Sequence, residues 1–352
     1  MKKITIIAVA VLIPFSLACC SRITADNPGT EQTVPDNPDD GQDHEESSDK
    51  TYPDGVSVTA FTDDLGDGKE CSGFIATVDF SSNDKLRFNI GYGGGYRLTP
   101  SEFYKEFNPN KGNPCLVING GYFSGSASVS LAISGGNFHC HNIMKMNWPN
   151  DENPSHTVYP VRSAFGRMED GTFEARWVYC VRESFREYYS FPSALDNDEQ
   201  TASFMDAPPT TETPGGQIWD PEDAIGGGPR LVKDGRNVAA ENYWAEVFDS
   251  GGTAGLSRQP RTAIGVTEEN VLVMIVCDGR GMNGSSGFTL SELADKFISL
   301  GVTDAINLDG GGSSAMIGHD GSVLNRPSDT GDSPTVIERP VVTAIIISEM
   351  KE

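Results

Sequence analysis

Apolar and polar positions alternate in short runs along most of the chain, and clusters of glycine, asparagine, aspartate and serine separate these runs. Runs that are rich in β-branched and aromatic residues and bounded by turn formers predict β-strands. The expected strands are Val56–Phe61, Gly73–Phe80, Lys85–Ile90, Cys115–Asn119, Ser163–Met168, Phe173–Tyr179, Arg261–Thr267, Val271–Cys277, Asp304–Leu308 and Val341–Ile347.

Two segments carry the signals of helices. Thr99 is a candidate N-cap, and Pro100 suits the first helical position because no partner is needed there for the N–H that proline lacks. Thr289 and Glu292 form a capping box, and Gly301 is the kind of residue at which helices commonly end. Apolar residues recur at helical spacing between them, at Leu290, Leu293, Ala294, Phe297, Ile298 and Leu300. A few helices among many strands predict an α+β fold with a mixed, strongly curved β-sheet.

The regular pattern extends over residues 55–352, which we expect to form a single domain. A length of about 300 residues is large for one domain but compatible with it. Residues 139–216 follow the pattern poorly and include a polar stretch rich in proline and threonine. We expect this segment to be an insertion that elaborates the domain.

The first residues have the layout of an export signal. A basic start at Met1-Lys2-Lys3 precedes an apolar run from Ile4 to Ala18, which is shorter than the roughly 20 residues of a membrane span. Cys19 follows a small residue, as in bacterial lipoproteins, so residues 1–19 are expected to be a lipoprotein signal peptide with Cys19 as the lipidated residue. Cys20 is the other register, and an ordinary secreted protein cut near Ala18 is the alternative. The interpretation predicts a cell-envelope protein, periplasmic or on the outer-membrane surface, held to a membrane by its lipid anchor.

Residues 20–54 are acidic and contain several prolines. Such a composition cannot bury enough apolar surface to offset the entropy of the chain, so a disordered linker is expected. The whole chain has a formal net charge of −24. This charge argues against nucleic acid as a partner, because binding to phosphate backbones requires a basic surface.

Five cysteines lie beyond the signal segment, at Cys71, Cys115, Cys140, Cys180 and Cys277. Their number is odd, and their spacing does not match that of metal ligands such as C-x-x-C. His139-Cys140-His141 is a weak metal signal, for which partial burial or a disulfide is the better explanation. We therefore expect neither a metal nor a cofactor.

Polar residues and glycines follow the ends of four apolar runs. Runs of glycine allow backbone N–H groups to face a ligand closely, and several N–H groups directed into one hollow bind anions. Aspartate serves as acid, base or nucleophile, and arginine offers phosphate a bidentate fork. The four segments are Asn119-Gly120-Gly121-Tyr122-Phe123, Gly226-Gly227-Gly228-Pro229-Arg230-Leu231, Val276-Cys277-Asp278-Gly279-Arg280 and Asn307-Leu308-Asp309-Gly310-Gly311-Gly312-Ser313-Ser314.

A single Asp-Gly or Asn-Gly pair is more often an ordinary turn than a site. Three successive glycines after Asp309 are different, because ordering them costs entropy that a plain turn would not require. No lysine follows these glycines, so the segment is not a P-loop. The alternating oxygen ligands of a calcium loop are also missing at Asp278 and Asp309.

These segments, together with Arg261-Thr262-Ala263-Ile264-Gly265 and the helix that begins at Thr289, occur in an order that resembles the phosphodiester glycosidase family. The resemblance covers about Pro114 to Ile347, and residues 139–216 fit it poorly. It implies a secreted hydrolase whose catalytic domain acts on a carbohydrate phosphodiester. Such an enzyme cleaves the bond between the anomeric carbon of a sugar and a phosphodiester oxygen, releasing the sugar and a phosphomonoester.

The resemblance also implies roles for individual residues. Asp278 and Asp309 are the expected catalytic carboxylates, as nucleophile or base, by the two-carboxylate logic of glycosidases. Arg261 and Arg280 are expected to stabilise the departing phosphate. The full set of expected substrate-binding residues is Asn119, Gly120, Gly228, Arg261, Thr262, Arg280, Asn307, Gly310, Gly311 and Ser313. Retention or inversion of the sugar stays open, and the alternative function is a non-catalytic surface module that binds anionic glycans.

Overall fold

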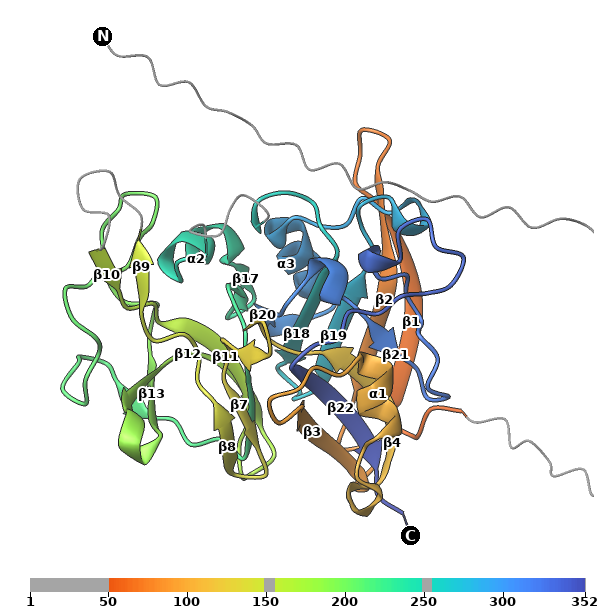
Figure 1. The fold of residues 1–352 in the computed structure, drawn as a ribbon, viewed down its shortest axis with the longest axis horizontal. Helices are drawn as coiled ribbons and strands as arrows, with labels where there is room; N and C mark the ends of the chain where they lie inside the picture. The colour runs from red at the N-terminus through yellow and green to blue at the C-terminus, as the bar shows by residue number, and fades with distance from the viewer. Residues whose placement is uncertain (1–50, 149–155, 249–254, 352) are drawn as a thin grey trace, which may run out of the picture. The chain divides into compact units, whose positions relative to one another are not determined.

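The computed structural model describes residues 51–148, 156–248 and 255–351, which belong to one compact unit (Figure 1). The expected signal peptide, with Cys19, and nearly all of the expected linker lie outside the described residues, so these assignments stay predictions. No helix within the described part of the chain is long and apolar enough to cross a membrane.

A seven-stranded sheet carries most of the segments in which the sequence predicts site residues. All of its strand pairs are antiparallel. The strands, in spatial order, are β1 (Val56–Asp64), β2 (Glu70–Val78), β19 (Leu272–Cys277), β18 (Arg261–Thr267), β20 (Val302–Asn307), β16 (Arg230–Lys233) and β17 (Arg236–Asn237). In this arrangement β19 and β20 end at the same edge at which β18 and β16 begin.

A second seven-stranded sheet and a four-stranded sheet complete the main β-structure. The second sheet has the order β14 (Gln217–Ile218), β13 (Glu187–Phe191), β12 (Phe173–Arg182), β11 (Arg162–Arg167), β15 (Asp223–Gly226), β7 (Ala132–Ser134) and β8 (Asn137–Cys140). The third has the order β21 (Met316–Ile317), β4 (Asn113–Asn119), β22 (Thr343–Glu349) and β3 (Leu86–Tyr92). Two short ribbons pair β9 (Met146–Trp148) with β10 (His156–Val158), and β5 (Phe123–Ser124) with β6 (Ala127–Ser128).

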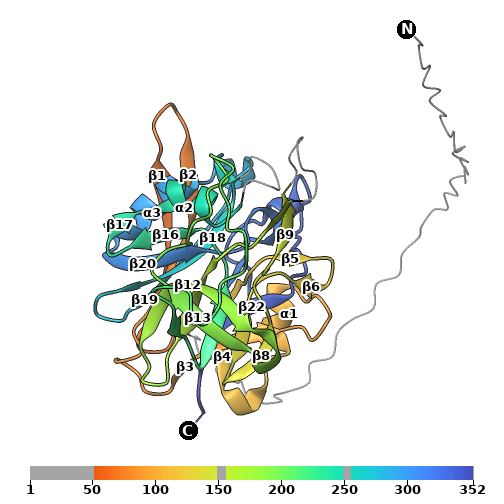
Figure 2. The ribbon, with the colours of Figure 1, turned by 90° about the vertical axis from the view of Figure 1, so that its left-hand side faces the viewer.

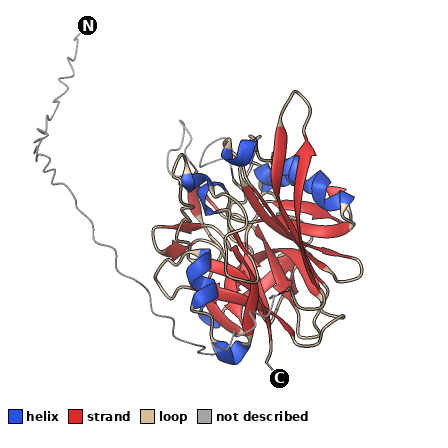
Figure 3. Ribbon diagram, turned by 90° about the vertical axis from the view of Figure 1, so that its right-hand side faces the viewer, coloured by secondary structure: helices blue, strands red, loops and turns tan. Residues whose placement is uncertain are grey.

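Helices are few and short (Figure 3). The α-helices are α1 (Pro100–Lys105), α2 (Ala239–Ala245) and α3 (Leu290–Ser299). Single 3₁₀ turns occur at Pro109–Lys111, Glu183–Phe185, Met282–Gly284, Gly311–Ser313 and Ser328–Thr330. The capping boxes expected at Thr99 and Thr289 are both present and fix the starts of α1 and α3.

The first sheet is buried on both faces, and the alternation along its strands explains why. In β18 and β19, Ile264 and Met274 face one core, whereas Ala263 and Ile275 face the other. The second core lies under α2 and α3, which cover the face of β16 and β20 (Figures 1 and 2). The first core joins the sheet to the other two sheets through residues such as Phe165.

The fold confirms the strands, the helices and the curved sheet that were expected from the sequence. Each expected strand coincides with an observed one, with ends shifted by a few residues. The structure is mostly β-sheet and includes a sheet that curls into a half barrel. The expected mixed sheet is wrong, because every pairing between described strands is antiparallel.

The expected insertion at residues 139–216 is not confirmed. This segment supplies β11 and β12, which lie inside the second sheet and pair through β11 with β15. Phe165 and Phe173 from this segment belong to the core shared with the first sheet. Its irregular sequence pattern reflects the loops between these strands.

Candidate active site

A cavity of about 440 Å³ opens where β20 ends and where β16 and β18 begin. The antiparallel order of these strands brings segments distant in sequence to the same edge of the sheet. Six of the residues expected from the sequence line the cavity: Arg261, Arg280, Asn307, Asp309, Gly310 and Gly311.

Asp309 directly follows the end of β20 and is held by its backbone. Its N–H donates to the Gly120 carbonyl at 3.1 Å, and its carbonyl accepts from Asn119 Nδ2 at 2.7 Å. Its Oδ1 accepts from the N–H of Gly310 at 3.0 Å. These bonds fix the backbone of Asp309, while its side chain lies at the cavity wall.

Burial raises the pKa of the Asp309 carboxyl to about 6, above its ordinary value of 3.8. The Ser313 hydroxyl, the Arg339 guanidinium and the Gly310 N–H oppose this rise because they favour the charged form. Ser313 Oγ is buried and has no partner at ordinary hydrogen-bond distance among the described residues, but it lies near enough to the Asp309 carboxylate to lower its pKa. A carboxyl with this pKa is charged at neutral pH and yet more basic than an exposed aspartate, which suits a general base.

Asn119 and Thr262 support the site from behind and do not line the cavity. Asn119 is fully buried, and its Oδ1 accepts from Thr262 Oγ1 at 2.7 Å and from the Ala315 N–H at 3.2 Å. Its Nδ2 holds the Asp309 carbonyl. Together with Gly120, they hold the backbone of Asp309, and their expected role in substrate binding stays a prediction.

Asn307 lines the cavity and connects its two sides. Its Nδ2 donates to Tyr122 Oη at 2.7 Å, to the Leu308 carbonyl at 2.7 Å and to the Gly228 carbonyl at 3.2 Å. Tyr122 Oη in turn donates to the Gly228 carbonyl at 2.8 Å. Gly228 is thus a backbone acceptor for this network, next to Pro229, which lines the cavity.

The glycines after Asp309 are required by close neighbours. Gly311 has φ +62°, and a Cβ at this position would lie 3.1 Å from Nη2 of Arg280. A Cβ at Gly312 would overlap the Arg339 guanidinium and the carboxylate of Asp329. The glycine run therefore lets two arginines approach the backbone beside Asp309.

Arg261 and Arg280 both line the cavity, and different parts of the chain hold their guanidinium groups. The guanidinium of Arg261 donates to the carbonyls of Phe288, Gly255 and Ser257 at 3.0, 3.0 and 2.8 Å. Burial lowers the pKa of Arg261, which still leaves it charged at neutral pH. Arg280 is more exposed, and donates to Gln259 Oε1 at 2.9 Å and Ser328 Oγ at 3.3 Å.

Asp278 does not line the cavity. Its Oδ1 accepts from Asn325 Nδ2 at 3.0 Å and from the Arg326 N–H at 2.8 Å, and its Oδ2 accepts from Asn283 Nδ2 at 2.8 Å. Burial raises the pKa of its carboxyl, whereas these hydrogen bonds lower it. Asn325 also donates to the Ser314 carbonyl, so Asp278 braces the loop that follows Asp309. The structure does not bring the two expected catalytic carboxylates into one cavity.

The other residues that line the cavity were not among the expected site residues, and they include Tyr122, Arg162, Tyr243, Phe248 and Arg339. Tyr122 follows the first glycine motif directly, so its position in that motif was an available signal. Arg339 forms a bidentate pair with Asp329, with two N–O distances of 2.8 Å. Arg162 begins β11 inside the segment that was expected to be an insertion, and no local pattern singles it out.

Metal and disulfide sites are not indicated by the described side chains. No group of three or more His, Cys, Asp or Glu residues in the described ranges is placed to hold a metal ion. The five cysteines beyond the signal segment are free thiols. What the cavity does combine is one partly buried carboxylate with four arginines, a set of side chains whose chemistry suits an anionic ligand.

Comparison with known proteins finds a family model and relatives that match part of this chain. Residues 182–348 match the family model of the phosphodiester glycosidases, which confirms the resemblance expected from the motifs. N-acetylglucosamine-1-phosphodiester alpha-N-acetylglucosaminidase from Bos taurus and from Homo sapiens is 30% identical over 125 residues, or 34% of this chain. The SPbeta prophage-derived uncharacterized protein YomE of Bacillus subtilis is 37% identical over 119 residues. These matches cover only 23%, 24% and 16% of the bovine, human and bacterial relatives, respectively.

Solved structures share the fold over a larger part of the chain. The catalytic domain of the zebrafish N-acetylglucosamine-1-phosphodiester alpha-N-acetylglucosaminidase, auto-inhibited by its pro-peptide, is similar with a TM-score of 0.57 and 21% identity. That match covers 86% of this chain and 85% of the zebrafish domain. A hypothetical protein from Synechocystis is similar with a TM-score of 0.52 and 18% identity over 83% of this chain and 62% of its own.

Proposed function

We propose that this protein is a phosphodiester glycosidase that releases a sugar and a phosphomonoester from a sugar-1-phosphodiester. The family match supports this class of reaction. The observation that carries the proposal is the cavity, which Asp309 lines together with Arg162, Arg261, Arg280 and Arg339. The formal net charge of the whole chain is −24, so an excess of basic residues in the composition does not explain four arginines at one cavity.

The arginines explain how the phosphate is bound and how it departs. Guanidinium groups form strong charge-assisted hydrogen bonds with phosphate oxygens. During the reaction the bond between the anomeric carbon and the phosphate oxygen breaks, and its electron pair leaves with the phosphomonoester. The charge that develops on this oxygen is stabilised by the fixed donors of the cavity.

Asp309 supplies the carboxylate that acts on the anomeric carbon, either by direct attack or by removing a proton from the attacking water. In both routes a water oxygen ends on the anomeric carbon. No second carboxylate among the described residues lines the cavity. A phosphate leaving group reduces the need for a general acid, so one carboxylate with several cations is a sufficient set. The stereochemistry of the released sugar, read by NMR, distinguishes the two routes.

Asp278 acts in this proposal as a positioning residue. Through Asn325 it fixes the backbone of the turn that follows Asp309. Both of its oxygens are engaged with protein donors, so neither is available for attack without breaking these bonds.

The N-terminal assignments complete the proposal. With Cys19 as a lipid anchor and residues 20–54 as a tether, the domain would act on carbohydrate phosphodiesters at the cell envelope. Composition supports this location: an apolar signal-like run, a cysteine after a small residue, and an acidic linker.

A panel of sugar-1-phosphodiesters tests the proposed function. The wild-type domain should release free sugar from at least one member, and Asp309→Asn should lose this activity while still binding the substrate. Asp84→Asn, a change at an exposed aspartate of the loop between β2 and β3, is the matched control and should keep full activity. Sugar release by Asp309→Asn at the wild-type rate would overturn the catalytic role of Asp309. Binding of the panel without sugar release by the wild-type domain would instead support the glycan-binding module.

A further inference from the structure

Arg162 is a buried cavity arginine that backbone carbonyls hold from one side. Its Nε donates to the Glu246 carbonyl at 3.1 Å, and its Nη2 donates to the Val247 carbonyl at 2.6 Å. Its guanidinium carbon lies 4.0 Å from the centre of the Phe248 ring, which also lines the cavity. No hydrogen bond of Nη1 to a described residue is formed, so this nitrogen keeps its donors for a ligand.

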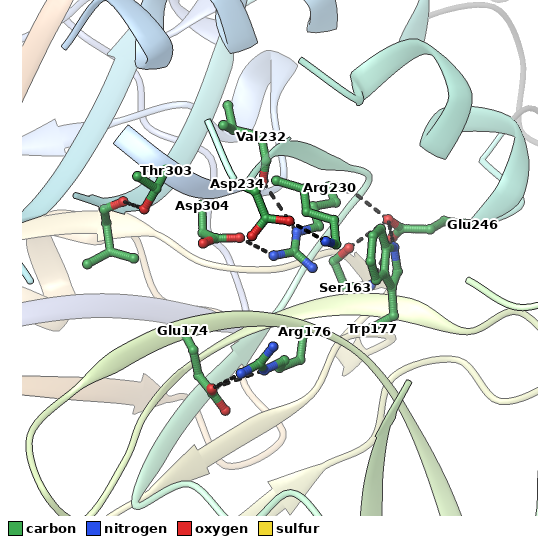
Figure 4. A network of polar contacts seen from close by, with 12 residues as sticks. Ser163, Glu174, Arg176, Trp177, Arg230, Val232, Asp234, Glu246, Thr303 and Asp304 are labelled. Carbon is green, nitrogen blue, oxygen red and sulfur yellow. Dashed lines mark hydrogen bonds and ion pairs between the residues drawn. The ribbon is translucent and has the colours of Figure 1, made fainter. Parts of the chain in front are cut away.

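Glu246 carries a buried carboxylate directly after α2, with 0% exposure. Its Oε1 accepts from Ser163 Oγ at 2.6 Å, Trp177 Nε1 at 2.9 Å and the Arg230 N–H at 2.8 Å. Its Oε2 accepts from the Ser163 N–H at 2.8 Å. Figure 4 shows this carboxylate between Trp177 and Arg230, with Ser163 beside it. Four donors fix its position, which offsets the cost of burying its charge.

These bonds join the two large sheets at the wall of the cavity. Ser163 and Trp177 belong to β11 and β12 of the second sheet, whereas Arg230 begins β16 of the first. A Cβ at Gly228 would lie 2.5 Å from Glu246 Oε2, so the turn that carries Pro229 into the cavity rests on this carboxylate. A change at Glu246 therefore reaches the cavity in two ways, through this turn and through the carbonyls that hold Arg162.

We propose that Arg162 binds the phosphate of the substrate through Nη1, and that Glu246 is a positioning residue that holds Arg162 and the adjacent turn in place for this contact. The inference rests on the proposed function for the identity of the substrate. It adds a second function for α2: the end of this helix supplies the carbonyl and the carboxylate on which one phosphate-binding arginine depends.

Two chemical consequences follow. Loss of a charge-assisted hydrogen bond to the phosphate should weaken binding of the substrate and of inorganic phosphate by about 10- to 100-fold. Because the phosphate is charged before and during the reaction, KM should rise and kcat should also fall. In Glu246→Gln, the new amide nitrogen faces the Ser163 N–H, or else the donors on Oε1, so the support of Arg162 is loosened although the side chain keeps its size.

The test uses the folded domain and four variants: Arg162→Ala, Glu246→Gln, Ser163→Ala and, as control, Asp304→Asn. Asp304 forms an ion pair with Arg230 on the side of that arginine away from Glu246, outside the cavity (Figure 4). Its variant therefore perturbs the same buried network without touching Arg162. Inorganic phosphate affinity is measured by calorimetry, and KM and kcat are measured with the active sugar-1-phosphodiester. Added guanidinium ion at millimolar concentration tests whether a free cation replaces the missing side chain.

Arg162→Ala should bind phosphate at least about tenfold more weakly and should recover activity with guanidinium. Glu246→Gln should show the same loss without guanidinium rescue, because Arg162 is still present. Ser163→Ala removes one of the donors and should give a smaller loss, which keeps the proposal testable if Glu246→Gln does not fold. Asp304→Asn should bind phosphate as the wild type does.

Wild-type phosphate affinity in Arg162→Ala would overturn the inference, as would equal losses in Glu246→Gln and Asp304→Asn. The proposed function fails in a different way, by absence of sugar release from the wild-type domain. In that case the phosphate titrations still decide whether Arg162 and Glu246 form an anion site.

Discussion

Replacing Asp309 with asparagine should stabilise the fold at neutral pH and abolish turnover. Asparagine has the shape of aspartate, and its side-chain oxygen can still accept from the Gly310 N–H. What the change removes is a negative charge that the folded protein holds in a cavity wall. Stability and activity should therefore change in opposite directions at this position, as at other sites where function requires a destabilised group.

The magnitude follows from the pKa of this carboxyl, about 6 in the folded protein against an ordinary value of 3.8. Since the folded-state pKa is raised, the folded protein binds the proton more tightly, and ionisation of Asp309 destabilises it. This cost is absent below about pH 4, grows as the pH rises, and is complete above about pH 6. A difference of roughly two pH units corresponds to at most about 3 kcal/mol. The melting temperature of Asp309→Asn should thus exceed that of the wild type by several degrees at pH 7.5 and match it near pH 4.

Thermal unfolding at the two pH values and sugar release at pH 7.5 measure both effects. The turnover number should fall by at least about 10²-fold, as for loss of a general base. In the wild-type enzyme, kcat/KM should rise with pH through about 6, because Asp309 must lose its proton to act. Asp84→Asn controls for the loss of one negative charge, because Asp84 is distant in sequence from the strand ends that form the cavity.

Two results would refute this reasoning. If Asp309→Asn were less stable than the wild type at pH 7.5, the carboxylate would be stabilised in the fold and its pKa would not be raised. If kcat/KM fell through pH 6, Asp309 would act in its protonated form, as an acid.

Four further changes test separate parts of the site. Asp278→Ala removes the acceptor of three donors, of which the Asn325 amide is buried, and should lower the free energy of unfolding by about 1–3 kcal/mol in denaturant titrations, with a smaller loss of kcat than Asp309→Asn; lost turnover at unchanged stability would make it catalytic. Arg280→Ala should raise KM about tenfold and leave the melting temperature unchanged, because this arginine is exposed. Gly312→Ala should displace Arg339 from its ion pair and raise KM, which kinetics and a crystal structure of the variant would both show. Cys19→Ala should move the protein from the membrane fraction to the soluble fraction on immunoblots, and a wholly soluble wild type would contradict the anchor.

The strands could be predicted because their signal is local. In β19, successive residues such as Met274 and Ile275 face different cores, and the whole strand is apolar because both faces are buried. The capping boxes at Thr99 and Thr289 are equally local. Sheet direction is not local, since it depends on which strands become neighbours. That is why an antiparallel arrangement was mistaken for a mixed sheet.

Site residues could be predicted where the backbone itself forms the site. The turn from Asp309 to Gly312 has a distinctive sequence because two arginines and the Gly120 carbonyl approach its backbone closely. Arg162 has no such signature. It reaches the cavity only because β11 pairs with β15 and because α2 ends beside it, and both are long-range features of the fold.

Asp278 and Asp309 show what sequence cannot distinguish. Both follow the end of an apolar strand and both precede glycine, so a local pattern assigns them the same chemistry. In the structure, Asp278 accepts three hydrogen bonds and lies outside the cavity, whereas the carboxylate of Asp309 accepts one, from Gly310. The two carboxylates differ in how many of their acceptor positions are occupied by protein donors. A carboxylate whose acceptor positions are occupied holds a loop in place. A carboxylate with open acceptor positions at a cavity can act on a substrate. In the proposed reaction, the cavity arginines would take the place that a second carboxylate has in ordinary glycosidases, because a phosphate leaving group requires charge stabilisation more than it requires a proton.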